Sequence, residues 1–152
     1  MNKGFTLFIA IIVMGTLLLI TAGITSLAVK QAFISSSGRE SQAAFYAADT
    51  GMDCALYWDV NNSGGNDSAF ATSTSSTINC NNTSIPSMGG GGYVNATSTF
   101  SFTLAPNPYC AIVTVSKVYV GGNLKTTIES KGYNTCDPSN PRRVERAVRA
   151  TY

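Results

Sequence analysis

The chain has 152 residues, of which 44% are hydrophobic and only 12% are charged, and its formal net charge is +2. It contains no histidine, which excludes histidine-based acid–base chemistry and histidine metal ligation. Once the apolar residues 1–29 are set aside, about 120 residues remain, which is enough for one small domain and no more.

The first expected element is a long apolar helix. A short head with one charge, Lys3, ends at Gly4, and no charged residue occurs from Phe5 to Val29. At about 1.5 Å of rise per residue, a helix of that length spans a bilayer core of about 30 Å with some tilt to spare. The sequence therefore predicts an exported protein that is anchored in a membrane by a single pass.

Three interpretations of this segment compete. A secretory signal peptide needs small residues at a cleavage site after the apolar run, but the run is followed by Lys30-Gln31-Ala32-Phe33. A plain signal anchor gives no reason for the Gly4–Phe5 junction. The third interpretation places the cut before the apolar run, after Gly4, so that Phe5 becomes a free N-terminus.

The junction Lys3-Gly4-Phe5-Thr6-Leu7 resembles the leader junction of the type IV prepilins. In that family a membrane peptidase cuts after the Gly and methylates the new N-terminal Phe. The resemblance implies a leader of residues 1–4 and a processing site at Gly4 and Phe5. It also implies that the helix half 5–29 is a membrane anchor before assembly and the filament core afterwards. Helix residues with this expected role include Phe5, Ile9, Leu17, Leu18 and Leu19.

The sequence departs from the prepilin pattern at Ile9. Prepilins commonly carry Glu at this position of the mature chain, where it is thought to meet the N-terminal amine of a neighbouring subunit. An acid inside a bilayer costs about 2.5 to 3.5 kcal/mol, so it is usually present for a partner. Because minor subunits near the filament tip often lack this Glu, Ile9 favours a minor subunit over a major one. The alternative is a major subunit that packs without the acid.

The amphipathic segment 30–58 contains no Pro and repeats small or apolar residues at three- and four-residue steps. We expect the helix to continue to about Trp58, with a bend at Gly38 or Gly51. The stretch from Gly38 to Gly51 is similar to a segment of PilX-type minor pilins, with Asp49 where those have Glu. We expect its aromatic side chains to pack where the helix meets the sheet; they are Phe45, Tyr46, Tyr57 and Trp58.

A globular head is expected from 59 to 152, as a polar loop over 59–97 followed by a sheet over 98–152. Residues 98–104 and 109–120 alternate or are β-branched, and Gly121-Gly122 is a hairpin signal before 124–133. For 142–152 the pattern allows a helix or a strand, and we favour the strand. The predicted fold class is α+β: a long N-terminal helix packed on a four-stranded antiparallel sheet, as in type IV pilins.

The four cysteines are Cys54, Cys80, Cys110 and Cys136, and no CxxC pair occurs among them. This usage fits two disulfides in an oxidising compartment, for which three connectivities are possible. We favour Cys54–Cys80 with Cys110–Cys136, because each bridge would staple a loop to a neighbouring element. Each would contribute about 3 kcal/mol in the chain-entropy model.

No catalytic constellation is present, so we expect neither enzymatic activity nor a cofactor, and no metal site. The segment Asp59-x-Asn61-x-Ser63-Gly64 has the first half of a calcium loop, but Phe70 stands where the last ligand should be. A negatively charged partner is suggested by four C-terminal arginines, which are Arg142, Arg143, Arg146 and Arg149. Such a cluster could contact acids of a neighbouring subunit or DNA phosphates, and we favour the subunit.

These features together predict a structural subunit of a type IV filament, a minor pilin or pilin-like protein at or near the tip. Its expected partners are other pilin subunits, prepilin peptidase, the inner-membrane assembly platform and membrane lipid, with DNA or a surface ligand as a further candidate. Its expected location is the cytoplasmic (inner) membrane and then an extracellular filament. Two alternatives stay open: a DNA-binding or adhesive pilin, and a type II secretion pseudopilin.

Overall fold

The computed structural model describes residues 3–61, 68–70, 76–88 and 95–152. The predicted loop over 59–97 includes 62–67, 71–75 and 89–94, and the predicted leader includes residues 1–2; these residues lie outside the described ranges. Within the described ranges, one helix is followed by six strands: α1 (Lys3–Val60), β1 (Ser76–Cys80), β2 (Thr83–Met88), β3 (Asn95–Thr103), β4 (Cys110–Val120), β5 (Asn123–Tyr133) and β6 (Glu145–Thr151).

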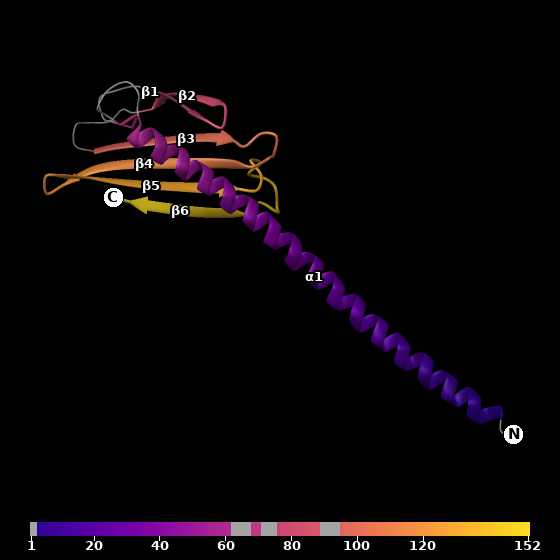
Figure 1. Cartoon of the computed structure of the whole chain (residues 1–152). Helices are drawn as coiled ribbons and strands as arrows, with labels where there is room; N and C mark the ends of the chain where they lie inside the picture. The colour runs from indigo at the N-terminus through magenta and orange to yellow at the C-terminus, as the bar shows by residue number, and fades with distance from the viewer. Residues whose placement is uncertain (1–2, 62–67, 71–75, 89–94) are drawn as a thin grey trace. The chain divides into compact units, whose positions relative to one another are not determined.

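The long helix α1 confirms the prediction of one helix through both the apolar and the amphipathic segments (Figure 1). It continues through Gly38 and Gly51 as an α-helix, and no proline interrupts its backbone hydrogen bonds. The chain divides into two compact units, Met1–Arg39 and Glu40–Tyr152, and α1 contributes to both. In the residues that the structure describes, the first unit is helix alone, whereas the second holds the last turns of α1 and the strands.

The main sheet is the predicted antiparallel meander, with strand order β3-β4-β5-β6. Gly121 and Gly122 form the two-residue turn between β4 and β5, where Val120 pairs with Asn123. Both glycines have positive φ, 60° and 86°, which a hairpin turn of this length requires and side-chain-bearing residues adopt rarely. The C-terminal segment forms strand β6 and not a helix. The preferred prediction of a strand within 142–152 is therefore confirmed.

A second, two-stranded sheet corrects the prediction of a single loop over 59–97. Strands β1 and β2 pair antiparallel, and Ile78 and Ile85 are partners in their register. Asn81 and Asn82 make the turn with φ of 48° and 60°, a backbone region that Asn tolerates better than most residues. The Ser, Thr and Asn that surround these two buried isoleucines conceal the strands, because they give the segment the composition of a polar loop.

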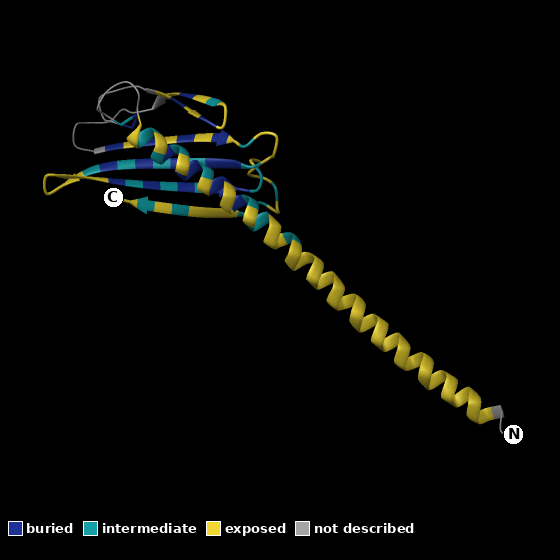
Figure 2. Cartoon of the chain, in the orientation of Figure 1, coloured by how far each residue is buried: buried dark blue, intermediate teal, exposed yellow. Residues whose placement is uncertain are grey.

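The head is held together by close packing of α1 on the inner face of the main sheet. Small residues on one side of the helix are fully buried: Ala44, Ala47, Ala48 and Ala55. Facing them are alternate sheet residues, which include Val113, Val115 and Ile128. Figure 2 shows this contrast within α1, which alternates between buried and exposed over the sheet and is exposed over its apolar half.

The backbones of α1 and the main sheet approach each other closely at Gly132 of β5. A side-chain carbon added to Gly132 would overlap the carbonyl oxygen of Ala44 and the amide nitrogen of Ala48. One turn further along the helix, a carbon added to Gly51 would lie 2.9 Å from Val113 Cγ2 and 3.0 Å from Ala111 Cβ, and would overlap Ser130 Oγ. Glycine in both elements therefore lets the helix and the sheet approach more closely than alanine would allow.

The aromatic residues of α1 only partly follow the expectation of a buried junction. Trp58 packs against the core and donates from Nε1 to the carbonyl oxygen of Asn79 at 3.1 Å. Phe45, Tyr46 and Tyr57 are 49%, 64% and 58% exposed, so the prediction of a buried position was wrong for these three. The small residues occupy the contact instead, since bulkier ones would hold the helix away from β5.

Gly132→Ala tests the backbone contact. We expect it to destabilise the head by at least about 3 kcal/mol, because the clash is with backbone that a rotamer change cannot move. The measurement is thermal unfolding of the full-length protein in detergent, followed by near-ultraviolet circular dichroism. Gly38→Ala is the matched control, since no atom lies within 4 Å of its added carbon and helix propensity favours Ala. Equal melting temperatures for Gly132→Ala and the parent protein would refute the close contact.

Candidate functional site

The apolar half of α1 presents exposed side chains on all sides within the single chain. Phe5, Ile9, Leu17, Leu18 and Leu19 are all exposed, and Gly4 lies in the first turn of the helix. This helix is long and apolar enough to cross a membrane. An unbroken apolar surface of this size is stable only against lipid or other protein chains, because exposure to water would favour association.

Three threonines in the apolar half have their hydroxyls satisfied by the helix itself. Thr16 donates to the carbonyl oxygen of Val13 at 2.9 Å, and Thr21 donates to that of Leu18 at 2.9 Å. Thr25 donates to the carbonyl oxygen of Thr21 at 2.8 Å. Polar groups that are paired within the helix can enter a hydrocarbon environment at little cost, so these residues do not oppose membrane insertion.

The first predicted disulfide is present and ties the helix to the small sheet. Cys54 of α1 is bonded to Cys80 at the end of β1, with a Cα–Cα distance of 5.9 Å. Trp58 lies one helical turn further on and contacts the same strand through its hydrogen bond to Asn79. The two-stranded sheet is thus attached to the end of α1 by one covalent bond and one hydrogen bond.

The second predicted bridge is absent from the structure, where Cys110 and Cys136 are free thiols. They are nevertheless neighbours: burial, and then a hydrogen bond with the Cys136 side chain, raise the pKa of the Cys110 thiol to about 12. Cys136 also donates from its backbone nitrogen to Pro108 at 3.1 Å, which holds the β5–β6 connection near the start of β4. The Cys110–Cys136 bridge therefore stays a prediction.

The four arginines do not form one patch. Arg146 donates from Nε to Ser41 Oγ of α1 at 2.9 Å, so its side chain lies on the helix side of β6. Arg149 stands three residues later on the opposite face of the strand, where it pairs in register with Glu129. Arg142 is exposed before β6, and the guanidinium of Arg143 stacks on the Tyr133 ring at 3.8 Å from its centroid.

A buried ion pair in the head was missed at the sequence level. Lys117 Nζ of β4 lies 2.7 Å from Asp59 Oδ1 at the end of α1, and the two side chains are only 7% and 5% exposed. Ser68 and Tyr152 also donate to the Asp59 carboxylate, and Lys117 donates to Thr126 at 3.2 Å. A sequence signal did exist, because Lys117 continues the buried face of Val113 and Val115 and so required an acidic partner.

The ion pair sets the protonation of Asp59. Burial by itself raises the pKa of this carboxyl, but hydrogen bonds from Lys117, Ser68 and Tyr152 together bring it below the ordinary value of 3.8. The carboxylate is therefore charged throughout the neutral range and neutralises Lys117. This arrangement also gives the first residue of the calcium-like segment a structural role in place of a metal ligand.

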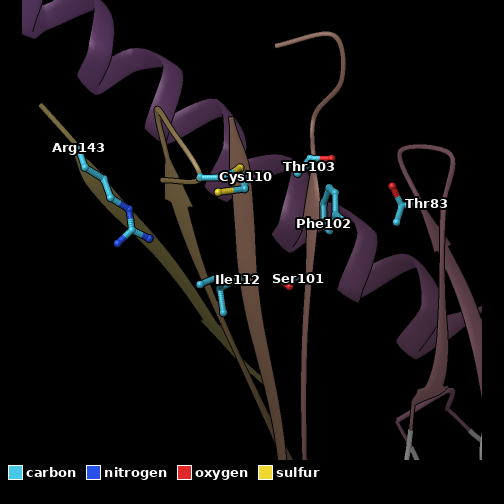
Figure 3. Close-up of a pocket in the computed structure, with 8 residues that line it drawn as sticks. Thr83, Ser101, Phe102, Thr103, Cys110, Ile112 and Arg143 are labelled. Carbon is cyan, nitrogen blue, oxygen red and sulfur yellow. The ribbon is translucent and has the colours of Figure 1, made fainter. Parts of the chain in front are cut away.

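A cavity of about 380 Å³ opens where β2, β3 and β4 approach the β5–β6 connection (Figure 3). Its lining combines hydroxyl, apolar, thiol and guanidinium groups: Thr83, Ser101, Phe102, Thr103, Cys110, Ile112, Cys136 and Arg143. In Figure 3 Arg143 stands on one side and Thr83 on the other. Across the described ranges, no group of three or more Cys, Asp or Glu side chains could hold a metal ion.

In comparisons with known proteins, no protein-family model, no characterised protein and no solved structure matches this chain. The physical features of the helix and of the head are therefore the basis for any assignment of function.

Asp59→Asn tests the buried ion pair. We expect a loss of about 3 to 5 kcal/mol at pH 7, because the Lys117 charge is left buried without its partner. Since the folded pKa of Asp59 lies below its ordinary value, its contribution is complete above about pH 4 and is lost as the pH falls further. Urea unfolding should therefore show a larger difference in stability between the two proteins at pH 7 than at pH 3.

The double variant Asp59→Leu/Lys117→Met is the control for this measurement. Removing both charges leaves no unpaired buried charge, so its stability at pH 7 should exceed that of Asp59→Asn. If Asp59→Asn and the parent protein unfold at the same urea concentration at pH 7, the pair contributes nothing and the assignment fails.

Proposed function

We propose that this protein is a structural subunit of a type IV filament, a minor pilin or pilin-like protein that is processed after Gly4. The observation that carries the proposal is a single apolar helix that follows a Lys3-Gly4-Phe5 junction, is exposed along its whole apolar half, and continues into the head as α1. A signal peptide is cut off after its apolar run, whereas α1 continues without a break from this run into the segment that packs on the sheet.

In the proposed mechanism, prepilin peptidase removes residues 1–4 and leaves Phe5 as the N-terminus. The apolar half of α1 holds the subunit in the inner membrane until the assembly platform draws it into the filament. Lipid covers the apolar side chains first, and the helices of neighbouring pilin subunits cover them afterwards. One continuous apolar surface thus serves both environments.

Ile9 supports a minor position for this subunit within the proposed filament. An apolar residue here leaves the amine of Phe5 without a carboxylate from another copy of the same chain. A neighbouring subunit that carries an acid at the matching depth could supply it, because an unpaired charge in hydrocarbon is costly. The subunit would therefore be placed beside a different pilin, at or near the tip, more readily than in a stack of identical copies.

The head fits a subunit that must transmit force through its helix. The backbone contact at Gly132, the buried Asp59–Lys117 pair and the Cys54–Cys80 bridge all join α1 to strands of the head. Tension along α1 would therefore be shared among several attachments of different kinds. A DNA-binding pilin is less well supported, because Arg146 and Arg149 lie on opposite faces of β6.

Gly4→Leu tests the proposal in cells that assemble the filament. The bulky side chain should block cleavage, so the protein should stay in the membrane fraction and be lost from filaments sheared off the cell surface. Gly15→Leu is the matched control, because it makes the same substitution within α1 at a position with no atom within 4 Å of the added carbon. Equal recovery of Gly4→Leu and the parent protein in sheared filaments would exclude the proposed processing.

A further inference from the structure

The cavity beside Arg143 has the composition of a ligand site. One guanidinium and three hydroxyls line it, together with the apolar side chain of Ile112. Ser101 and Thr103 lie two residues apart on one face of β3, and their partners in the sheet register are Ile112 and Cys110. Thr83 adds a hydroxyl from β2. Ligand sites typically combine a concave apolar surface with a few convergent polar groups, as found here.

Arg143 supplies an unused hydrogen-bond donor at this cavity. Its guanidinium is held in place on the Tyr133 ring, 3.8 Å from the centroid. Its Nε is buried, and within the described part of the chain it has no hydrogen-bond partner. Arg143 also lines the cavity, and a carboxylate is the acceptor that best matches the planar fork of a guanidinium. The arginine is therefore oriented before any ligand arrives.

The hydroxyl groups narrow the chemistry of the ligand. Serine and threonine hydroxyls both donate and accept hydrogen bonds, which suits a ligand that carries several hydroxyls of its own. The half-buried Ile112 offers an apolar contact of the kind that the face of a sugar ring can cover. We propose that this cavity binds a uronic acid residue of an acidic polysaccharide, with its carboxylate on Arg143 and its ring hydroxyls on Thr83, Ser101 and Thr103.

A phosphate backbone fits the same surface less well. Among the described residues that line the cavity, Arg143 is the one cation, and Arg146 is turned toward Ser41 on the helix side of β6. Nucleic acid binding depends on several cations that follow successive phosphates, so a single guanidinium gives little affinity. A single carboxylate on an uncharged, hydroxyl-rich ligand matches the one available charge. This inference concerns the head alone and does not rest on the filament proposal.

Titration of the full-length protein in detergent with galacturonic acid tests the site, with galactose and acetate as comparison ligands. We expect galacturonic acid to bind with a Kd of about 1 mM, since a ligand of this size rarely binds more tightly. Galactose lacks the carboxylate and acetate lacks the ring, so each should bind at least about tenfold more weakly. Arg143→Met should weaken galacturonic acid binding by about 10- to 100-fold.

Arg146→Met is the matched control, because it removes an exposed arginine of the same segment that faces α1 instead of the cavity. It should leave the Kd unchanged, and Arg143→Lys should restore part of the binding that Arg143→Met loses. Near-ultraviolet circular dichroism of each variant checks that the head is folded. The proposal is overturned if galactose or acetate binds as well as galacturonic acid, if Arg146→Met and Arg143→Met lower binding equally, or if only duplex DNA binding depends on Arg143.

Discussion

The backbone contact between α1 and β5 is the constraint on which the rest of the head depends. Gly132 lets the strand approach Ala44 and Ala48 of the helix with no side chain between them. Where the backbones meet, the helix buries alanines, and the side chains of Phe45, Tyr46 and Tyr57 are exposed. The Asp59–Lys117 pair and the Cys54–Cys80 bridge lie further along the same helix and hold its end. The position of each attachment follows from the first contact.

The sequence predicts the elements with strong periodicity and fails where one element determines the environment of another. The uncharged run after Phe5 specifies the helix, and the alternation at Phe100 and Phe102 together with Gly121-Gly122 specifies the meander. The outward aromatic residues and the small β1–β2 sheet could not be predicted, because both depend on contacts between distant segments. Lys117 could be predicted in part. Strand alternation indicates that its side chain is buried, but it does not identify Asp59 as the partner.

The candidate sites also include some features that the sequence predicted and some that it did not. Cys54 and Cys80 are joined as in the preferred pairing, whereas Cys110 and Cys136 are adjacent thiols. The four arginines are close in sequence, but strand geometry directs Arg146 and Arg149 to opposite faces. Residues that are close along a strand therefore need not share a surface. Of the four arginines, Arg143 is the one that stacks on Tyr133 and lines the cavity. No local sequence pattern reveals the contact with Tyr133 or the position of Arg143 at the cavity.

The central claim is that the apolar helix is kept while the residues before it are removed. The most direct test is mass analysis of the N-terminal peptide from protein isolated from its native membrane or filament fraction. We expect a chain that begins at a methylated Phe5. A chain that still begins at Met1 would show that the helix is an uncleaved anchor, and a chain that begins after Val29 would show that it is a signal peptide. Either result would contradict the claim.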